Sequence, residues 1–199
     1  SEMCIRDSII NNPVFFLFGS NTNAAGQTVT GEIPRFFAGD PTAGSFLVGF
    51  FPVMLLGYPA AALAMIHTAR TSQKRLIAGV LLSAALTSLL TGITEPIEFA
   101  FTFVAPILYV ANILLSGLSA YVCNLLGIKA GFGFSAGFID YALNYGLSTK
   151  PILLLVVSVA FGVLFYGVWR ALIQALNLPT PGRFEEEAAQ NASATVLSA

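Results

Sequence analysis

Two carboxylates and a proline interrupt a long apolar part of this chain. Between Leu76 and Gly127, Glu95 and Glu98 are the only Asp, Glu, Lys, Arg or His residues, and Pro96 lies between them. A charge at bilayer depth is costly, so it normally faces a polar cavity or a partner. A proline also breaks the helical hydrogen-bond ladder, and broken backbone is tolerated at that depth where it lines a cavity or is buried in protein. Residues 92–99 therefore predict a polar site inside a helical membrane protein, as in many transporters.

The composition fits a membrane setting. Hydrophobic residues make up 56% of the chain and charged residues 10%, with a mean hydropathy of +0.79, whereas soluble domains carry about 25% charged residues. The net charge of -1 and the lack of a basic stripe argue against a nucleic-acid partner. Cys4 and Cys123 have neither metal-ligand nor disulfide spacing, and Cys123 is expected to pack as a small apolar residue. We expect no cofactor and no metal.

The pattern predicts an all-α integral membrane protein, a multi-pass helical transporter domain with broken helices and re-entrant hairpins. Residues 9–18 are too short to span, since spanning needs about 20 apolar residues, and are expected to be interfacial or re-entrant. Residues 19–31 read as a loop. Residues 46–69 are expected as two helical pieces that meet at a bend near Gly57 and Pro59. Further helices are predicted at residues 76–90, 97–104, 106–126, 138–144 and 151–176.

The two ends differ in character from the rest of the chain. Residues 1–8 have no helical or strand period and are expected to be a non-native leader on a truncated piece of a longer protein. Residues 184–199 are acidic and rich in alanine and serine, and are expected to be a disordered linker. Tyr166 and Trp169 are expected in an interfacial aromatic belt, and the tail is expected to be cytoplasmic by the positive-inside tendency. The basic residues behind that orientation are Arg70, Lys74, Arg75, Arg170 and Arg183.

Five blocks in order carry a resemblance to a known family: GEIPRFFAGDPTAG, GFFPVMLLGYPAAALAMIHTA, LTGITEPIEFAFTFVAPILY, GFGFSAGFIDYALNYG and LNLPTPGR. Together they resemble the membrane subunit, enzyme IIC, of the bacterial sugar phosphotransferase system, in its glucose and N-acetylglucosamine family. The resemblance covers about residues 18–183 and identifies residues 9–183 as the C-terminal part of the transport domain. HTA and GITEPIEF look more like glucose permeases, whereas the GFGFSAG block looks like the N-acetylglucosamine subgroup.

The resemblance implies a permease of the cell (inner) membrane, a homodimer in full-length form. It would bind a hexose or N-acetylhexosamine and present it to a cytoplasmic phosphocysteine (enzyme IIB) domain, and the sugar would leave as its 6-phosphate. Neither Cys4 nor Cys123 lies in that domain's Cys-Ile-Thr-Arg-Leu-Arg type of motif. The phosphoryl-donating residue is therefore expected on another domain or chain, towards which residues 184–199 would lead.

Three residues are the candidates for the site. A carboxylate accepts hydrogen bonds from sugar hydroxyls, so Glu95 is the predicted catalytic and substrate-binding residue, which would orient the 6-hydroxyl or take its proton; its structural alternative is a helix cap. Glu98 is a second substrate-binding candidate, although an acid in the first turn of a helix is also stabilised by the helix dipole. His67, the only histidine, is the third candidate, with a structural polar role as its alternative.

Other polar residues keep two interpretations. Asp140 is expected to be a structural acid at a helix start, while Ser135 and its neighbouring glycines would let backbone approach a cavity. Arg35 and Asp40 form either a surface ion pair or a device for gating or loop ordering. Three function classes are considered: a phosphotransferase-coupled transporter, a passive channel and a non-transporting sugar receptor. The five blocks favour the first.

Overall fold

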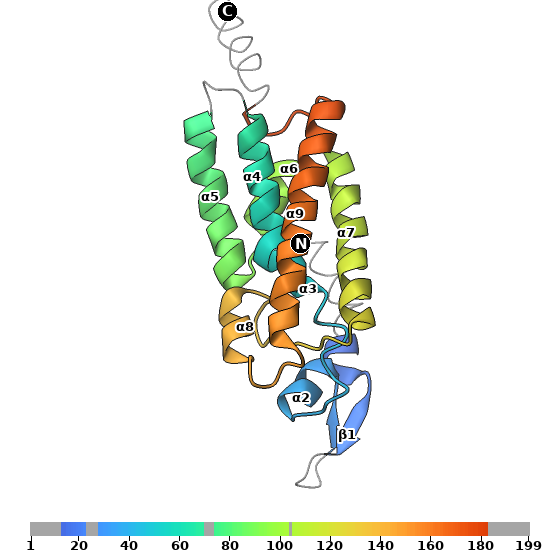
Figure 1. Ribbon diagram of the computed structural model, residues 1–199. Coiled ribbons are helices and arrows are strands. Elements are labelled where there is room, and N and C mark those ends of the chain that lie inside the picture. The colour runs from blue at the N-terminus through green and yellow to red at the C-terminus, as the bar shows by residue number, and fades with distance from the viewer. Residues whose placement is uncertain (1–12, 23–27, 70–73, 104, 183–199) are drawn as a thin grey trace, which may run out of the picture.

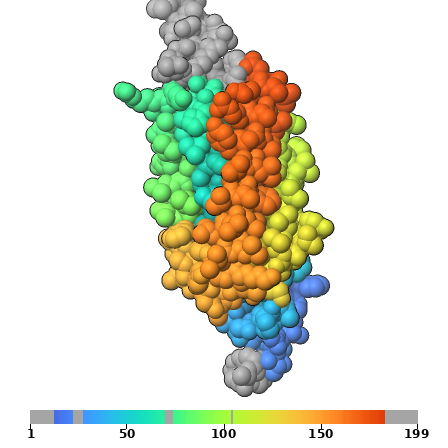
Figure 2. All heavy atoms as spheres, viewed as in Figure 1, coloured from blue at the N-terminus to red at the C-terminus, as the bar shows by residue number. Residues whose placement is uncertain are grey.

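A computed structural model describes residues 13–22, 28–69, 74–103 and 105–182. It shows an elongated helical bundle with a small hairpin and short helices at one end (Figures 1 and 2). The predicted leader and acidic linker lie outside the described residues, as do Arg70 and Arg183.

Among the described residues, four helical stretches are long and apolar enough to cross a membrane. They are Phe50–Thr68, α5 (Lys74–Thr91), α7 (Pro106–Leu125) and α9 (Pro151–Ala175). In Figure 1 they run along the long axis of the molecule, and α4 (Tyr58–Thr68) packs against both α5 and α9. The shorter helices α6 (Glu95–Thr102) and α8 (Phe138–Leu143) lie between them in sequence. The prediction of a mostly helical, multi-pass membrane domain is confirmed.

Residues 46–69 are predicted as two helical pieces that meet near Gly57 and Pro59, and the backbone does not break between them but stays helical throughout Phe50–Thr68. The helix changes type instead: α3 (Phe50–Pro52) passes into a π-helical turn, η2 (Val53–Gly57), and then into α4. In the π turn the Tyr58 N–H donates to the Val53 carbonyl. Pro59 has no N–H to offer the Met54 carbonyl, and the Ser88 hydroxyl donates to that carbonyl over 2.9 Å. A wider turn and a side chain from α5 thus accommodate the second proline.

The polar stretch predicted as a loop is a β-hairpin. Strands β1 (Ser20–Thr22) and β2 (Thr28–Thr30) pair antiparallel, with Asn21 opposite Val29. Thr28, Val29 and Thr30 are β-branched and suit a strand, which the loop prediction overlooked. Before the hairpin lies η1 (Pro13–Leu17), a short π-helix without buried residues, and after it lies α2 (Glu32–Phe37).

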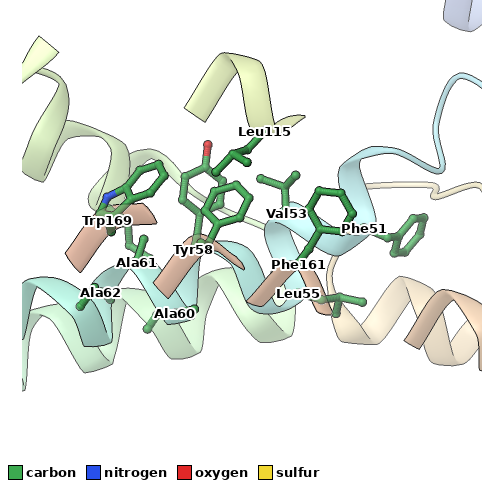
Figure 3. Close-up of a cluster of buried hydrophobic side chains, with 14 of the residues drawn as sticks. Phe51, Val53, Leu55, Tyr58, Ala60, Ala61, Ala62, Leu115, Phe161 and Trp169 are labelled. Carbon is green, nitrogen blue, oxygen red and sulfur yellow. The ribbon is translucent and has the colours of Figure 1, made fainter. Parts of the chain in front are cut away.

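The core lies where α9 meets the α3–α4 stretch (Figure 3). Trp169 is fully buried there, with its ring stacked on Phe165 at 5.1 Å between centroids and edge-on to Phe101 at 5.6 Å. The expectation that Trp169 belongs to an interfacial belt was therefore wrong, because it shares the inward face of α9 with Phe165, one turn earlier. Cys123 is fully buried, as expected of a small apolar residue.

Candidate functional site

The polar site predicted from the sequence lies at an interruption between two helices. Helix α5 ends at Thr91, α6 begins at Glu95, and residues 92–94 are not helical. Gly92 adopts a φ of +74°, a left-handed conformation that favours glycine. Pro96 lies in the first turn of α6, where a missing N–H breaks no helical bond. The prediction of a broken helix at this point is confirmed, although Glu95 and Pro96 already belong to the new helix.

A glycine-rich loop supports this break from the side. The Ser135 hydroxyl donates to the Gly92 carbonyl over 2.9 Å. Gly137 lies so close that a Cβ there would stand 2.6 Å from the Gly92 nitrogen. Asp140, in α8, accepts backbone N–H bonds of 3.0 Å from both Gly133 and Ser135. Asp140 therefore orders the loop, which matches its structural interpretation, and the glycines permit backbone-to-backbone contact at the break.

Glu98 is held by hydrogen bonds at the start of α6. Its Oε1 accepts bonds from the Tyr58 hydroxyl and from the Thr94 hydroxyl, the latter over 3.0 Å. The Tyr58 hydroxyl in turn accepts a bond of 2.9 Å from Nδ2 of Asn112. Tyr58 and Asn112 are buried, and Glu98 is half-buried. A single chain of hydrogen bonds thus joins α7, α4 and α6.

Sequence reasoning missed Tyr58, Thr94 and Asn112. A signal for Asn112 was present, because it is an amide flanked by Ala111 and Ile113 in an apolar helix. Polar side chains in membrane helices face the bundle interior and bond across helices. Tyr58 gave no such signal, since tyrosine is equally expected at a membrane interface.

Glu95 differs from Glu98 in being exposed. Two hollows flank the break between α5 and α6. One, of about 480 Å³, runs along α5 to Pro96, the residue after Glu95, and the other, of about 460 Å³, lies between the break and α8. The first is lined by Gly79, Val80, Ser83, Ala84, Thr87 and Pro96, and the second by Thr91, Ile93, Phe134, Ile139, Asp140 and Leu143. Glu95 is the exposed carboxylate at the break, and it is not among the residues that line either hollow.

His67 lies elsewhere, near the end of α4. Its side chain is exposed, and its Nδ1 lies 2.9 Å from the Tyr166 hydroxyl. Arg170 donates to the same hydroxyl over 3.0 Å, so Tyr166 links His67 to Arg170. His67 follows Tyr58 by nine residues, which is about 13.5 Å along a helix. The structure therefore brings Glu95 and Glu98 onto one helical turn and places His67 in a separate cluster.

A third polar cluster surrounds α2. The Arg35 side chain bonds Asp40 at 2.6 and 2.8 Å and donates to the Thr42 hydroxyl over 2.6 Å. Burial alone would raise the pKa of Asp40, but hydrogen bonds from Thr42 and the charge of Arg35 outweigh it and lower that pKa from 3.8 to about 2. Glu32 is buried and accepts the Gly44 N–H over 2.7 Å. These contacts order the loop that follows α2, so the Arg35–Asp40 pair is more than a surface ion pair.

Within the described ranges, no three His, Cys, Asp or Glu side chains gather closely enough to hold a metal ion.

Comparison with known proteins identifies a family of membrane proteins, in agreement with the long apolar helices. The family described as "Phosphotransferase system, EIIC" matches residues 6–117, more than half of the chain. This chain belongs to the EIIC family. The matched residues include α4, α5, the break and Asn112. With the four long apolar helices, membership of this family identifies a multi-pass protein of the cell membrane.

Curated EIIC relatives are similar along nearly the whole chain. The glucosamine-specific EIICBA component of Bacillus subtilis (strain 168) is 52% identical over 92% of this chain and 29% of its own length. The N-acetylglucosamine-specific EIIC component of Streptomyces coelicolor (strain ATCC BAA-471 / A3(2) / M145) is 51% identical over 89% of this chain and 43% of its own. The N-acetylglucosamine-specific EIICBA component of Escherichia coli (strain K12) is 50% identical over 90% of this chain and 28% of its own length. The chain thus spans less than half the length of these relatives.

Proposed function

We propose that this EIIC chain supplies the sugar-binding part of a phosphotransferase-system permease, and that Glu95 is its central substrate ligand. The observation that carries the proposal is the break between α5 and α6, which presents an exposed carboxylate beside a second, anchored one. An ionised acid is costly at membrane depth unless it faces a polar partner. Sugar hydroxyls are donors that suit a carboxylate.

An amino sugar is the proposed substrate class. Relatives at about half identity are specific for glucosamine or N-acetylglucosamine by name. These names support N-acetylglucosamine or glucosamine over the glucose alternative suggested by the HTA and GITEPIEF blocks. Competition between the three sugars for binding to a full-length protein carrying this sequence would settle the choice.

The proposed reaction transfers a phosphoryl group to the 6-hydroxyl. The 6-hydroxyl oxygen attacks the phosphorus of a phosphocysteine on an enzyme IIB domain, and the S–P bond breaks to leave a thiolate. Glu95 orients the hydroxyl and accepts its proton as the new O–P bond forms. The EIICBA names of two relatives support such a IIB partner.

The remaining assignments belong to the same proposal. Residues 9–183 would form the C-terminal part of the transport domain, in the bacterial inner membrane, with a cytoplasmic tail and a homodimeric full-length protein. Re-entrant hairpins are part of the same proposal. Glu98 and His67 are proposed as additional substrate-binding residues, Glu98 next to Glu95 and His67 from the end of α4.

Glu95→Gln tests the proposal. The amide keeps the size and one acceptor but loses the charge, and bonds to charged groups contribute about 1.5–3 kcal/mol against roughly 1 kcal/mol for neutral pairs. In a full-length protein with its IIB partner, we expect normal insertion and a loss of sugar affinity between a few-fold and about a hundred-fold. Parental affinity and phosphorylation rate in a normally inserted variant would refute the role of Glu95. Sugar flux that needs no phosphorylated partner would instead support a passive channel.

A further inference from the structure

Glu98 is fixed by hydroxyl groups from two sides. Its Oε1 accepts from Tyr58, which lies where the π turn gives way to α4, and from Thr94, which precedes α6. Bonds to a carboxylate are charge-assisted and stronger than neutral ones. The first turn of α6 is therefore tied both to its own preceding residue and to a neighbouring helix.

The chain of bonds has one direction. Asn112 donates from Nδ2 to the Tyr58 oxygen over 2.9 Å, so the Tyr58 proton is committed to Glu98. Oδ1 of Asn112 is buried without a hydrogen-bond partner in the part of the chain that the structure describes. A rotated amide would let Oδ1 accept the Tyr58 proton and would remove it from Glu98. In the structure the Asn112 amide has the orientation that leaves the Tyr58 proton for Glu98, and Oδ1 of Asn112 is the atom left without a partner among the described residues.

The tyrosine that links these helices is deeply packed. The Tyr58 ring lies in the buried cluster and its hydroxyl points towards the segment that carries Leu115, in α7 (Figure 3). Packing limits how far this hydroxyl can move, so the position of Glu98 is limited as well.

We infer that Tyr58 and Asn112 are positioning residues for substrate binding: they fix Glu98, and so hold the first turn of α6 in the orientation that presents Glu95 at the break. Residues three apart share one helix face, so anchoring Glu98 also sets the direction of Glu95. Glu95, which the protein leaves exposed, is then free to meet the ligand. This inference rests on the proposed role of Glu95 as the sugar ligand.

Tyr58→Phe and Asn112→Leu in a full-length protein test the inference. Each removes one link of the chain and keeps much of the buried volume. We expect affinity for the preferred amino sugar to fall about five- to thirty-fold, as for the loss of one to two kcal/mol. The phosphorylation rate at saturating sugar should change less than about two-fold, because the groups that touch the reacting atoms remain. Equal losses in affinity and saturated rate, or no loss in either, would overturn the inference.

Three further variants separate positioning from stability. Glu98→Gln keeps an oxygen that accepts from Tyr58 and Thr94, so it should retain affinity better than Glu98→Leu. Ser119→Ala is the matched control, because it removes a buried bond of 2.8 Å from α7 to the Gly49 carbonyl. It should lower the unfolding temperature and leave sugar affinity unchanged. If Tyr58→Phe does not fold, the Glu98 pair decides: equal affinities for Gln and Leu would overturn the inference.

A double-mutant cycle with Glu95 distinguishes this inference from the proposed function. If Tyr58 acts through Glu95, then Tyr58→Phe should cost little further affinity once Glu95 is Gln. Full additivity of the two effects would overturn the positioning role alone. Parental affinity of Glu95→Gln by itself would instead overturn the proposed function.

Discussion

The hydroxyl of Ser135 donates to the carbonyl of Gly92 over 2.9 Å, so the loop before α8 holds the break between α5 and α6. The two residues lie 43 positions apart in sequence. A left-handed Gly92 leaves its carbonyl outside the helical ladder of α5, and Ser135 supplies the donor. The candidate site is therefore built by two loops rather than by one broken helix.

Gly137→Ala should destabilise the protein by about 1–3 kcal/mol, since a new methyl group would have to displace backbone. A Cβ at this position would stand 2.6 Å from the Gly92 nitrogen, the Leu90 oxygen and the Thr91 carbonyl carbon. Thermal unfolding in detergent measures the effect. Gly146→Ala is the control, because a Cβ there meets nothing within 4 Å. Equal unfolding temperatures for the two variants would show that the loops can separate freely.

Ser88→Ala should also destabilise the protein, by about 1–3 kcal/mol, because it leaves the half-buried Met54 carbonyl without its donor. Pro59→Ala restores a backbone N–H in the adjoining turn. We expect Ser88→Ala to cost less in that background, which a double-mutant cycle of unfolding free energies detects. Thr87→Ala is the control, since the Thr87 hydroxyl bonds only within α5, to the Ser83 carbonyl at 3.0 Å. Strict additivity would mean that Pro59 is not the reason for the Ser88 bond.

The lowered pKa of Asp40, in the loop after α2, predicts that the stability of the protein depends on pH. Its pKa is lowered to about 2 in the folded protein, against about 3.9 in an unfolded chain. A depressed pKa contributes stability that is fully present above about pH 4 and is lost as the pH falls through the folded value. Asp40→Asn should therefore be less stable than the parent above about pH 4, and the difference should shrink towards pH 2. Unfolding temperatures compared across this window would contradict the assignment if the difference stayed constant.

Trp169→Phe should cost less than a typical loss of a large buried side chain. The indole nitrogen of Trp169 is buried with no hydrogen-bond partner among the described residues, so removing it relieves an unsatisfied donor. Trp169→Ala, which also empties the stack with Phe165, should cost about 3–5 kcal/mol. The comparison of both variants by chemical unfolding checks this, and similar losses for Phe and Ala would refute the relief argument.

The sequence predicted the helices well because apolar length and proline position are local properties. The starts of α6, α7 and α9 each coincide with a proline in the first turn, which the pattern already marked. The continuous helix through Pro59 has a non-local cause. The helix continues past Pro59 because Ser88 donates a hydrogen bond to the Met54 carbonyl. Ser88 lies on another helix, so no local sequence pattern reveals this contact.

The candidate site was predictable only in part. Two acids in an apolar stretch pointed to the break, because the cost of burying charge can be read from composition alone. Which acid is anchored and which is exposed depends on the approach of Tyr58 and Asn112. The location of His67, paired with Tyr166 near the end of α4, likewise follows from how α4 and α9 pack.

The π turn in the first spanning helix has a further consequence. A π turn can in principle migrate along a helix when neighbouring N–H groups exchange their carbonyl partners one after another. Here the exchange is blocked on one side by Pro59, which has no N–H, and the freed Met54 carbonyl is occupied by Ser88. The irregularity is therefore fixed in one place, and α5 cannot slide along η2 without giving up that bond. Moving α5 away from the π turn would therefore cost about 1 kcal/mol for this bond alone.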